Sequence, residues 1–264
     1  MKQMSFLDRY GEWAIVTGAS SGIGREIAKQ VAARGLSVVL VARRQAEIET
    51  LAREIEKTSK VKTLTVAVDL TLPESRVAVV EAVRGRAVGL LVNSAGFGSG
   101  GEFVKADFAG QSEMVEVNCQ ALLELTHVFA KRFVEQKRGG IILLSSIVAF
   151  QGAAYSANYA ATKAYVQSLA EGLREELKPY GVDVLASAPG PTSTGFGARA
   201  GMRLSNAASA ETVARQTLDA LGNKGTVVAG GFAKLLYAGL MTAPRFLRVK
   251  IMRGIMKSMT GENL

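Results

Sequence analysis

The stretch WAIVTGASSGIG, residues 13–24, joins an apolar strand-like run to a glycine-rich turn, and a helical pattern over residues 25–34 follows it. A strand, a turn of this kind and a helix N-terminus form a phosphate cradle, because the first N–H groups of the helix are unpaired and carry a partial positive charge. Gly18 permits the tight turn, Gly22 lets a pyrophosphate approach the backbone, and Gly24 allows close packing of helix on strand. The spacing G-x-x-x-G-x-G differs from the common G-x-G-x-x-G pattern, so the turn alone is a modest signal.

The composition indicates one α/β domain with a substantial core. The chain has 264 residues, of which 48% are hydrophobic and 21% charged, and it contains no repeat or low-complexity segment. The single cysteine, Cys119, excludes an intramolecular disulfide, and no signal peptide precedes the first strand. We therefore expect a cytoplasmic protein. The apolar run at residues 230–244 contains Lys234 and is shorter than the ~20 residues that a membrane span needs.

Apolar runs of strand length alternate with helical patterns along the chain. We expect strands at residues 13–16, 37–42, 61–68, 89–92, 140–145, 182–187 and 226–229, and helices at 25–34, 46–57, 73–84, 111–135 and 158–177. Because parallel strands need helical crossovers, this order predicts a single doubly wound Rossmann domain with a mostly parallel sheet of about seven strands and helices on both faces. We assign residues 1–230 to this domain and residues 231–264 to a basic amphipathic C-terminal helical extension of it.

Special residues follow six of the expected strands. They are the glycine turn, residues 43–44, residues 69–70, residues 93–96, residues 145–146 and residues 189–190. In a doubly wound sheet, ligands bind beyond the carboxyl ends of the strands, near the switch in strand order. The sequence therefore predicts that these segments meet at one binding edge.

Two arginines follow the second expected strand, where dinucleotide-binding folds meet the adenosine ribose. An acidic residue there would bind the 2′-hydroxyl of NAD, but the sequence has Arg43 and Arg44 and no carboxylate before Glu47. Two guanidinium groups can chelate a 2′-phosphate, so the pattern favours NADP(H). The alternative is that both arginines are solvated surface residues, which is the usual place of arginine.

A tyrosine and a lysine lie one helical turn apart in the expected helix at 158–177. Tyr159 and Lys163 are four residues apart and share a helix face. A free phenol titrates near a pKa of about 10, and a neighbouring ammonium group lowers that pKa toward the working pH. Ser146, at the end of a strand, could hold a carbonyl oxygen beside the phenol. The set indicates general acid–base chemistry on a carbonyl, although Y-x-x-x-K alone also occurs on the surface of long helices.

Together these features resemble the short-chain dehydrogenase/reductase (SDR) family in its ordinary-length branch. The motifs that carry the resemblance are T-G-x-x-x-G-x-G at 17–24, Asp69, N-x-A-G at 93–96, Asn118 in V-N-C, Ser146, Tyr159, Lys163 and P-G-x-x-x-T at 189–194. Ser94 and Thr192 depart mildly from the family pattern, and neither change removes a proton-transfer group. The opening R-Y-G-x-W-A-I-V-T-G, residues 9–18, and the basic tail are similar to a bacterial subgroup of DltE-type reductases.

The resemblance implies a role for each site residue. Tyr159 would be the general acid/base, Ser146 would orient the substrate, Lys163 would bind the nicotinamide ribose and lower the tyrosine pKa, and Asn118 would hold a water in a relay to Lys163. The cofactor-binding residues would be Gly18, Ser20, Ser21, Gly22, Ile23, Gly24, Arg43, Arg44, Asp69, Leu70, Asn93, Ala95, Gly96, Tyr159, Lys163, Pro189, Gly190, Thr192 and Thr194. The family also implies a homodimer or homotetramer that packs through the helices carrying Asn118 and Tyr159. No metal or nucleic-acid site is expected.

The segment at residues 195–210 and the tail leave alternatives open. The resemblance implies a mobile lid at 195–210 and an apolar-leaning carbonyl or alcohol substrate, although the segment could also be a surface loop. The tail carries six basic side chains against Glu262. It is either an amphipathic helix, broken at Pro244, that covers the core or a subunit interface, or a peripheral contact with the inner face of a membrane.

The expected function is an NADPH-dependent oxidoreductase that reduces a ketone or aldehyde to an alcohol, or catalyses the reverse reaction. A non-catalytic NADP-sensing protein and a membrane-associated reductase of lipid-like carbonyls are the alternatives. A sensor would not need both Ser146 and Tyr159, which argues against the first alternative.

Overall fold

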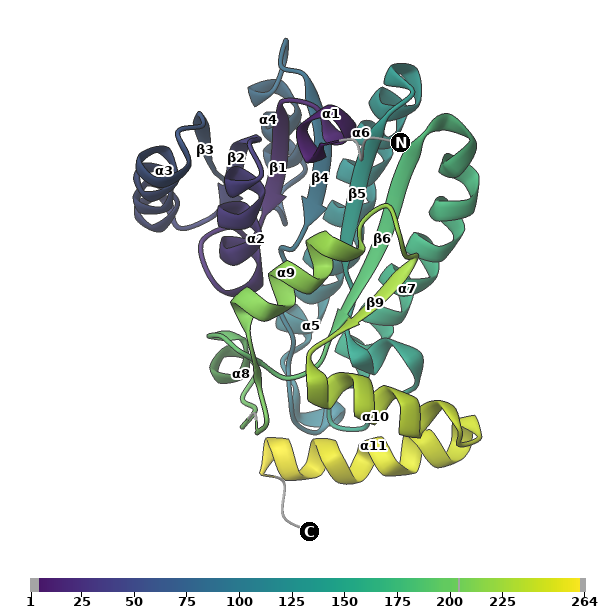
Figure 1. Cartoon of the computed structure of the whole chain (residues 1–264). Helices are drawn as coiled ribbons and strands as arrows, with labels where there is room; N and C mark the ends of the chain where they lie inside the picture. Colours follow the sequence, from purple (N-terminus) through teal and green to yellow (C-terminus); the bar gives the residue numbers. More distant parts are fainter. Residues whose placement is uncertain (1–4, 204, 262–264) are drawn as a thin grey trace.

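The computed structural model describes residues 5–203 and 205–261. Seven parallel strands form one sheet in the order β3-β2-β1-β4-β5-β6-β9 (Figure 1). The strands are β1 Trp13–Thr17, β2 Ser37–Ala42, β3 Thr63–Ala67, β4 Val88–Asn93, β5 Gly139–Leu144, β6 Val182–Pro189 and β9 Thr226–Ala229. The strand order reverses between β1 and β4, where ligands of doubly wound folds bind. The single Rossmann-type α/β domain expected from the sequence is confirmed.

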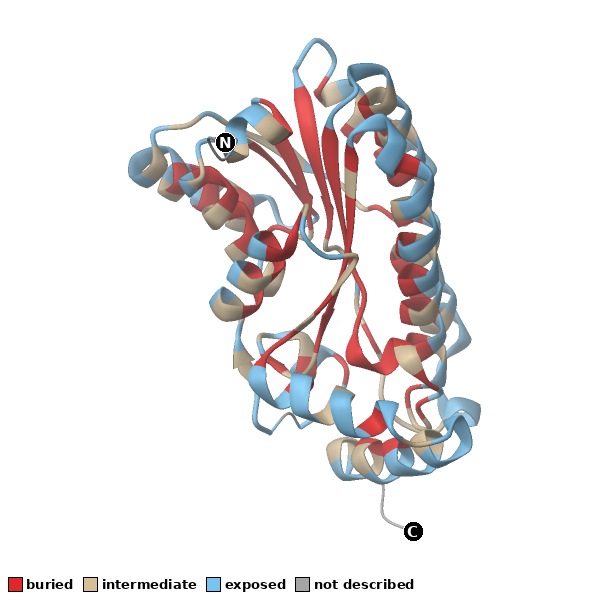
Figure 2. Cartoon of the chain, turned by 45° about the vertical axis from the view of Figure 1, so that its right-hand side comes forward, coloured by how far each residue is buried: buried red, intermediate tan, exposed pale blue. Residues whose placement is uncertain are grey.

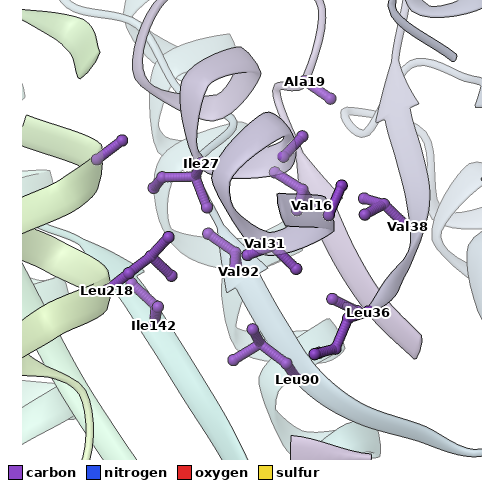
Figure 3. Close-up of a cluster of buried hydrophobic side chains, with 14 of the residues drawn as sticks. Val16, Ala19, Ile27, Val31, Leu36, Val38, Leu90, Val92, Ile142 and Leu218 are labelled. Carbon is purple, nitrogen blue, oxygen red and sulfur yellow. The ribbon is translucent and has the colours of Figure 1, made fainter. Parts of the chain in front are cut away.

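Helices cover both faces of the sheet because neighbouring residues of each strand point to opposite sides. On one face, α2 Gly22–Ala33, α3 Gln45–Ser59 and α9 Ala210–Ala220 pack on side chains such as Val16, Val92 and Ile142 (Figure 3). On the other face, α4 Pro73–Ala82, α6 Leu122–Gln136 and α7 Ala157–Leu177 pack on their neighbours Ile15 and Leu91. The central strands are therefore buried on both sides, as their continuous apolar runs predict.

Three elements differ from the sequence prediction. The strand expected at 61–68 is shorter, because β3 lies at the sheet edge and its residues are only half-buried. The helix expected at 111–135 begins earlier, as α5 Phe108–Val115, and passes through a π-helical turn, Glu116–Ala121, before α6. A short N-terminal helix, α1 Phe6–Tyr10, was not predicted.

The helix α1 is fixed to the sheet by polar contacts. Arg9 Nε lies 2.7 Å from Asp183 Oδ2 in β6, and the Tyr10 hydroxyl donates to the same oxygen at 2.9 Å. These bonds hold α1 against β6.

The segments after β6 close the binding edge. The lid region contains β7 Thr192–Ser193, α8 Phe196–Arg199 and β8 Ala208–Ser209, and β7 pairs with β8. Beyond β9 the tail folds into α10 Gly231–Met241 and α11 Arg245–Thr260, so the helix break expected at Pro244 is confirmed. Leu204, within the expected lid, and Glu262 lie outside the described residues. No helix among the described residues is long and apolar enough to cross a membrane.

Candidate active site

The glycine turn leaves β1 and packs directly against the loop that follows β4. Gly18 has a φ of +69°, and a Cβ there would lie 2.8 Å from the Ala95 nitrogen. The hydroxyl of Thr17 accepts the backbone N–H groups of Ser94 and Ala95, each at 3.0 Å. A side chain at position 18 would therefore force apart the two loops at the switch point of the sheet.

A cavity of about 1060 Å³ extends from this turn to α7, the lid region and the tail. Every site residue expected from the sequence lines it except Asn93 and Asn118. Segments far apart in the chain thus meet at one edge, as the positions after the strands predict. Among the described residues, no group of three or more His, Cys, Asp or Glu side chains could hold a metal ion.

The two asparagines lie behind the cavity wall. Asn93 Nδ2 donates to Thr126 Oγ1 at 3.0 Å, away from the cavity. Asn118, which has no exposed surface, accepts the Phe97 N–H at 3.1 Å and donates to the Phe97 carbonyl at 2.9 Å and to Thr162 Oγ1 at 3.0 Å. Asn118 lies on the π-helical turn, and its amide fixes the loop after β4 to α7.

Ser146, Tyr159 and Lys163 converge on the cavity wall. Ser146 ends the loop after β5, and its side chain is close enough to the Tyr159 phenol to lower the pKa of that phenol. Lys163 Nζ donates to the Leu144 carbonyl at 2.7 Å and lies 5.8 Å from the centroid of the Tyr159 ring. The hydroxyl of Ser145 donates to the Lys163 carbonyl at 3.1 Å, so strand β5 holds the helix that carries both groups.

Burial controls the titration of the two central groups. It raises the pKa of the Tyr159 phenol to about 12, against the opposing effect of the Ser146 hydrogen bond. Burial also lowers the pKa of the Lys163 ammonium to about 8. The expectation that Lys163 lowers the tyrosine pKa is wrong in this structure, because desolvation of the phenolate outweighs the opposing effect. The phenol is consequently protonated at neutral pH and can donate its proton.

Two arginines occupy the end of the cavity near β2. Arg44 donates to Ser20 Oγ at 2.9 Å, and Arg43 Nη1 lies 3.4 Å from both Asp69 Oδ2 and Glu113 Oε1. Burial alone would raise the pKa of Asp69. Hydrogen bonds from Thr71 and Arg43 lower this pKa by a larger amount, so the net shift is downward. The carboxylate is therefore ionised and restrains Arg43 beside the cavity.

Two further residues of this end were missed by the sequence analysis. Glu113 lies on α5, and Arg199 comes from the lid helix α8, with its guanidinium 4.1 Å from the Phe97 ring centroid and 3.8 Å from Glu113. Both line the cavity. No local motif marks either residue, because their contact joins elements that are distant in the sequence.

The opposite end of the cavity is apolar. Phe196 of the lid lies 5.4 Å from the Tyr159 ring, centroid to centroid. Four methionines also line the cavity, one from the lid region and three from α11; they are Met202, Met252, Met256 and Met259. The prediction that the apolar face of the tail covers the core is confirmed.

A parallel sheet with a glycine turn at its ligand edge, next to a buried Ser–Tyr–Lys set, defines a Rossmann-type oxidoreductase. The profile of the family described as short chain dehydrogenase matches residues 12–204, and the chain belongs to this family. It is accordingly an oxidoreductase of the type that uses a nicotinamide cofactor and acts on alcohols and ketones.

Similar proteins include two kinds of oxidoreductase. A 7beta-hydroxysteroid dehydrogenase of Clostridium sardiniense is 32% identical over 191 residues, which are 72% of this chain and 73% of the relative. A very-long-chain 3-oxoacyl-CoA reductase of Neurospora crassa is 35% identical over 181 residues, 66% of this chain but 54% of the relative. The chain thus spans about half the length of that second relative.

Solved structures agree with the fold. One from work on 7beta-hydroxysteroid dehydrogenase stereoselectivity has a TM-score of 0.87 at 26% identity, over 94% of this chain and 99% of that chain. A short-chain dehydrogenase from Sphingobium yanoikuyae in complex with NADPH has a TM-score of 0.78 at 32% identity, over 89% and 96%. The grouping with DltE-type reductases stays a prediction.

Proposed function

We propose that this protein is an NADPH-dependent reductase of a bulky, apolar ketone or aldehyde, or the corresponding alcohol dehydrogenase. The observation that carries the proposal is one continuous cavity. It has two arginines at one end, Tyr159 in its wall and an apolar chamber at the other end.

The end of the cavity that contains the two arginines fits a dinucleotide phosphate. Ser21, the N-cap of α2, makes no side-chain capping bond, and it lines the cavity together with Gly22 and Ile23, the first two residues of the helix. The helix N-terminus is thus available to a pyrophosphate. Arg43 and Arg44 would hold the 2′-phosphate of NADP(H), and the NADPH complex of the Sphingobium yanoikuyae relative supports this choice of cofactor.

The catalytic residues would act on the carbonyl oxygen. When bound, NADPH supplies the hydride that reduces the carbonyl carbon. Tyr159, protonated because its pKa is about 12, would donate its phenolic proton to the carbonyl oxygen, and Ser146 would orient that oxygen by a hydrogen bond. The Lys163 ammonium would hold the nicotinamide ribose and stabilise the phenolate that remains. Asn118 would act as a positioning residue through the loop after β4.

The substrate chamber favours a large apolar molecule. Its methionines have flexible, polarisable side chains that adapt to irregular ligands. The related proteins are named for a hydroxysteroid and for a very-long-chain 3-oxoacyl-CoA, both of which carry extensive hydrocarbon. We accordingly propose substrates with a ring system or a long chain beside the carbonyl.

The test is NADPH oxidation with ketones of increasing size. Turnover should rise from small ketones to a steroid ketone or a long-chain 3-oxo ester, and NADH should be a poorer cofactor. Binding of NADPH without turnover of any carbonyl would favour the sensing protein instead, although the buried Ser146–Tyr159 pair argues against that alternative.

Assembly and location are parts of the same proposal. We propose a cytoplasmic homodimer or homotetramer that packs through the helices carrying Asn118 and Tyr159, which light scattering during size-exclusion chromatography would test. Residues 1–230 form the catalytic domain in this proposal, and residues 231–264 extend it. A peripheral membrane contact through the tail is independent of the proposed reductase activity, because the contact depends on the outer surface of α10 and α11 and not on the cavity.

A further inference from the structure

The two tail helices form a surface with cations and no carboxylates of their own. Residues 231–261 contain six basic residues and no acidic one. The basic residues are Lys234, Arg245, Arg248, Lys250, Arg253 and Lys257. Among residues 5–203 and 205–261, no carboxylate oxygen lies within 4.0 Å of any of these six cations. The field of this surface is therefore not neutralised locally.

The same surface exposes large apolar side chains. Leu235 is 74% exposed and Phe246 is 67% exposed, whereas Met252 and Met256 on the opposite side of α11 are buried. Phe246, Lys250 and Arg253 follow a spacing of four and three residues, so an aromatic ring and two cations share one stripe of α11. Figure 2 shows exposed residues along the outer side of both helices and buried residues toward the fold.

We infer that the outer surface of α10 and α11 docks on an anionic lipid bilayer. Cations beside exposed Phe and Leu side chains match a surface whose head groups are negative and whose interior is apolar. A second copy of the chain fits poorly, because a two-fold contact would place this carboxylate-free surface against itself. A nucleic acid would pair with the cations but leave Leu235 and Phe246 in water.

The helices that carry the docking surface also supply an exposed part of the cavity wall. Phe232, Gly254 and Ser258 line the cavity and are themselves exposed. In Figure 1, α10 and α11 lie together at one end of the molecule, so a bilayer at this end would lie next to that exposed part of the wall. A carbonyl substrate dissolved in the bilayer could then enter without crossing water, and this last step alone rests on the proposed function.

The test is co-sedimentation of the full chain with vesicles, which needs no turnover. Vesicles of phosphatidylcholine are compared with vesicles in which about a third of the lipid is phosphatidylglycerol. Three variants are compared with the wild type. Lys250→Glu/Arg253→Glu reverses charge on the surface, Leu235→Ser/Phe246→Ser removes apolar side chains, and Lys57→Glu/Lys60→Glu makes the same charge change at the C-terminal end of α3, away from the tail helices.

The wild type and the α3 variant should bind the anionic vesicles, and salt should weaken that binding. Each tail variant should bind at least about tenfold more weakly, while reducing a water-soluble ketone as fast as the wild type. Equal sedimentation with both lipids, or no loss in either tail variant, would overturn the proposal. Binding to a short DNA duplex but not to vesicles would also overturn the proposal. A dimer that dissociates in the Leu235→Ser/Phe246→Ser variant would overturn it as well. A chain that reduces no carbonyl but still binds anionic vesicles would contradict the proposed function only.

Discussion

Replacement of Arg44 by alanine should weaken the binding of NADPH much more than that of NADH. The Arg44 side chain is half-exposed, and it is restrained by Ser20 at 2.9 Å and by Glu47 at 3.4 Å. Because it is partly hydrated, its proposed bond to a 2′-phosphate would have the strength of a charge-assisted hydrogen bond, about 1.5–3 kcal/mol, and not that of a dry ion pair. The dissociation constant of NADPH should therefore rise by roughly 10- to 150-fold, and that of NADH by less than about threefold.

The assay is an equilibrium titration of both dinucleotides, followed by nucleotide fluorescence at two salt concentrations. Arg53→Ala on α3, which lies outside the cavity, is the matched control and should change neither constant. Salt should weaken NADPH binding to the wild type more than NADH binding, and this difference should shrink in Arg44→Ala. Equal weakening of the two dinucleotides, or no weakening of either, would refute the assignment of the 2′-phosphate to this arginine.

Three other predictions concern stability and substrate size. Lys163→Met should abolish turnover yet stabilise the fold at pH 7 by up to about 3 kcal/mol, because the lowered pKa, about 8, means that burying the ammonium costs free energy. Urea titrations should show this gain shrinking above pH 8, where the folded lysine is already neutral, and a gain that does not depend on pH would contradict the reasoning. Met256→Lys should place a charge in the apolar chamber and eliminate turnover of bulky ketones, while NADPH titration gives an unchanged dissociation constant. Asp183→Ala should leave Arg9 and Tyr10 without their acceptor and lower the free energy of unfolding by about 1–3 kcal/mol, with kcat unaltered. Asp219→Ala, on the exposed surface of α9, is the control and should lower the free energy of unfolding by less than about 1 kcal/mol.

Local patterns predicted the fold and the segments that form the nucleotide end of the cavity. Each strand at the centre of the sheet is a continuous apolar run, and each ligand-edge segment follows its strand directly, so both can be read over a few residues. Tyr159 and Lys163 were predicted in the same way, because a spacing of four residues places them together on any helix.

Features that depend on tertiary contacts could not be predicted from local patterns. Asn93 belongs to a recognisable motif, yet its side chain turns toward α6 and not toward the cavity. The contact of Arg199 with Phe97 and Glu113 joins a lid helix to two other elements. The raised pKa of Tyr159 likewise reflects burial, which no motif reports.

The contacts of the tail helices also could not be predicted from local patterns. Its amphipathic pattern predicted helices and the break at Pro244, but not that the methionines of α11 would line the cavity. That placement depends on how the last two helices fold back over the binding edge. The sequence alone therefore indicated a carbonyl reductase more clearly than it indicated the size of the substrate.

In the proposed reaction, Tyr159 supplies the proton in an NADPH-dependent reduction. The most direct measurement is single-turnover NADPH oxidation with a bulky ketone by the wild type and by Tyr159→Phe, beside a titration of NADPH binding to both. We expect a rate lower by at least about 100-fold in the variant, with NADPH affinity retained within about threefold. A variant that keeps the wild-type rate would show that Tyr159 is not the proton donor. A wild type that binds NADPH, but for which no carbonyl compound supports NADPH oxidation, would show that the protein is not a carbonyl reductase.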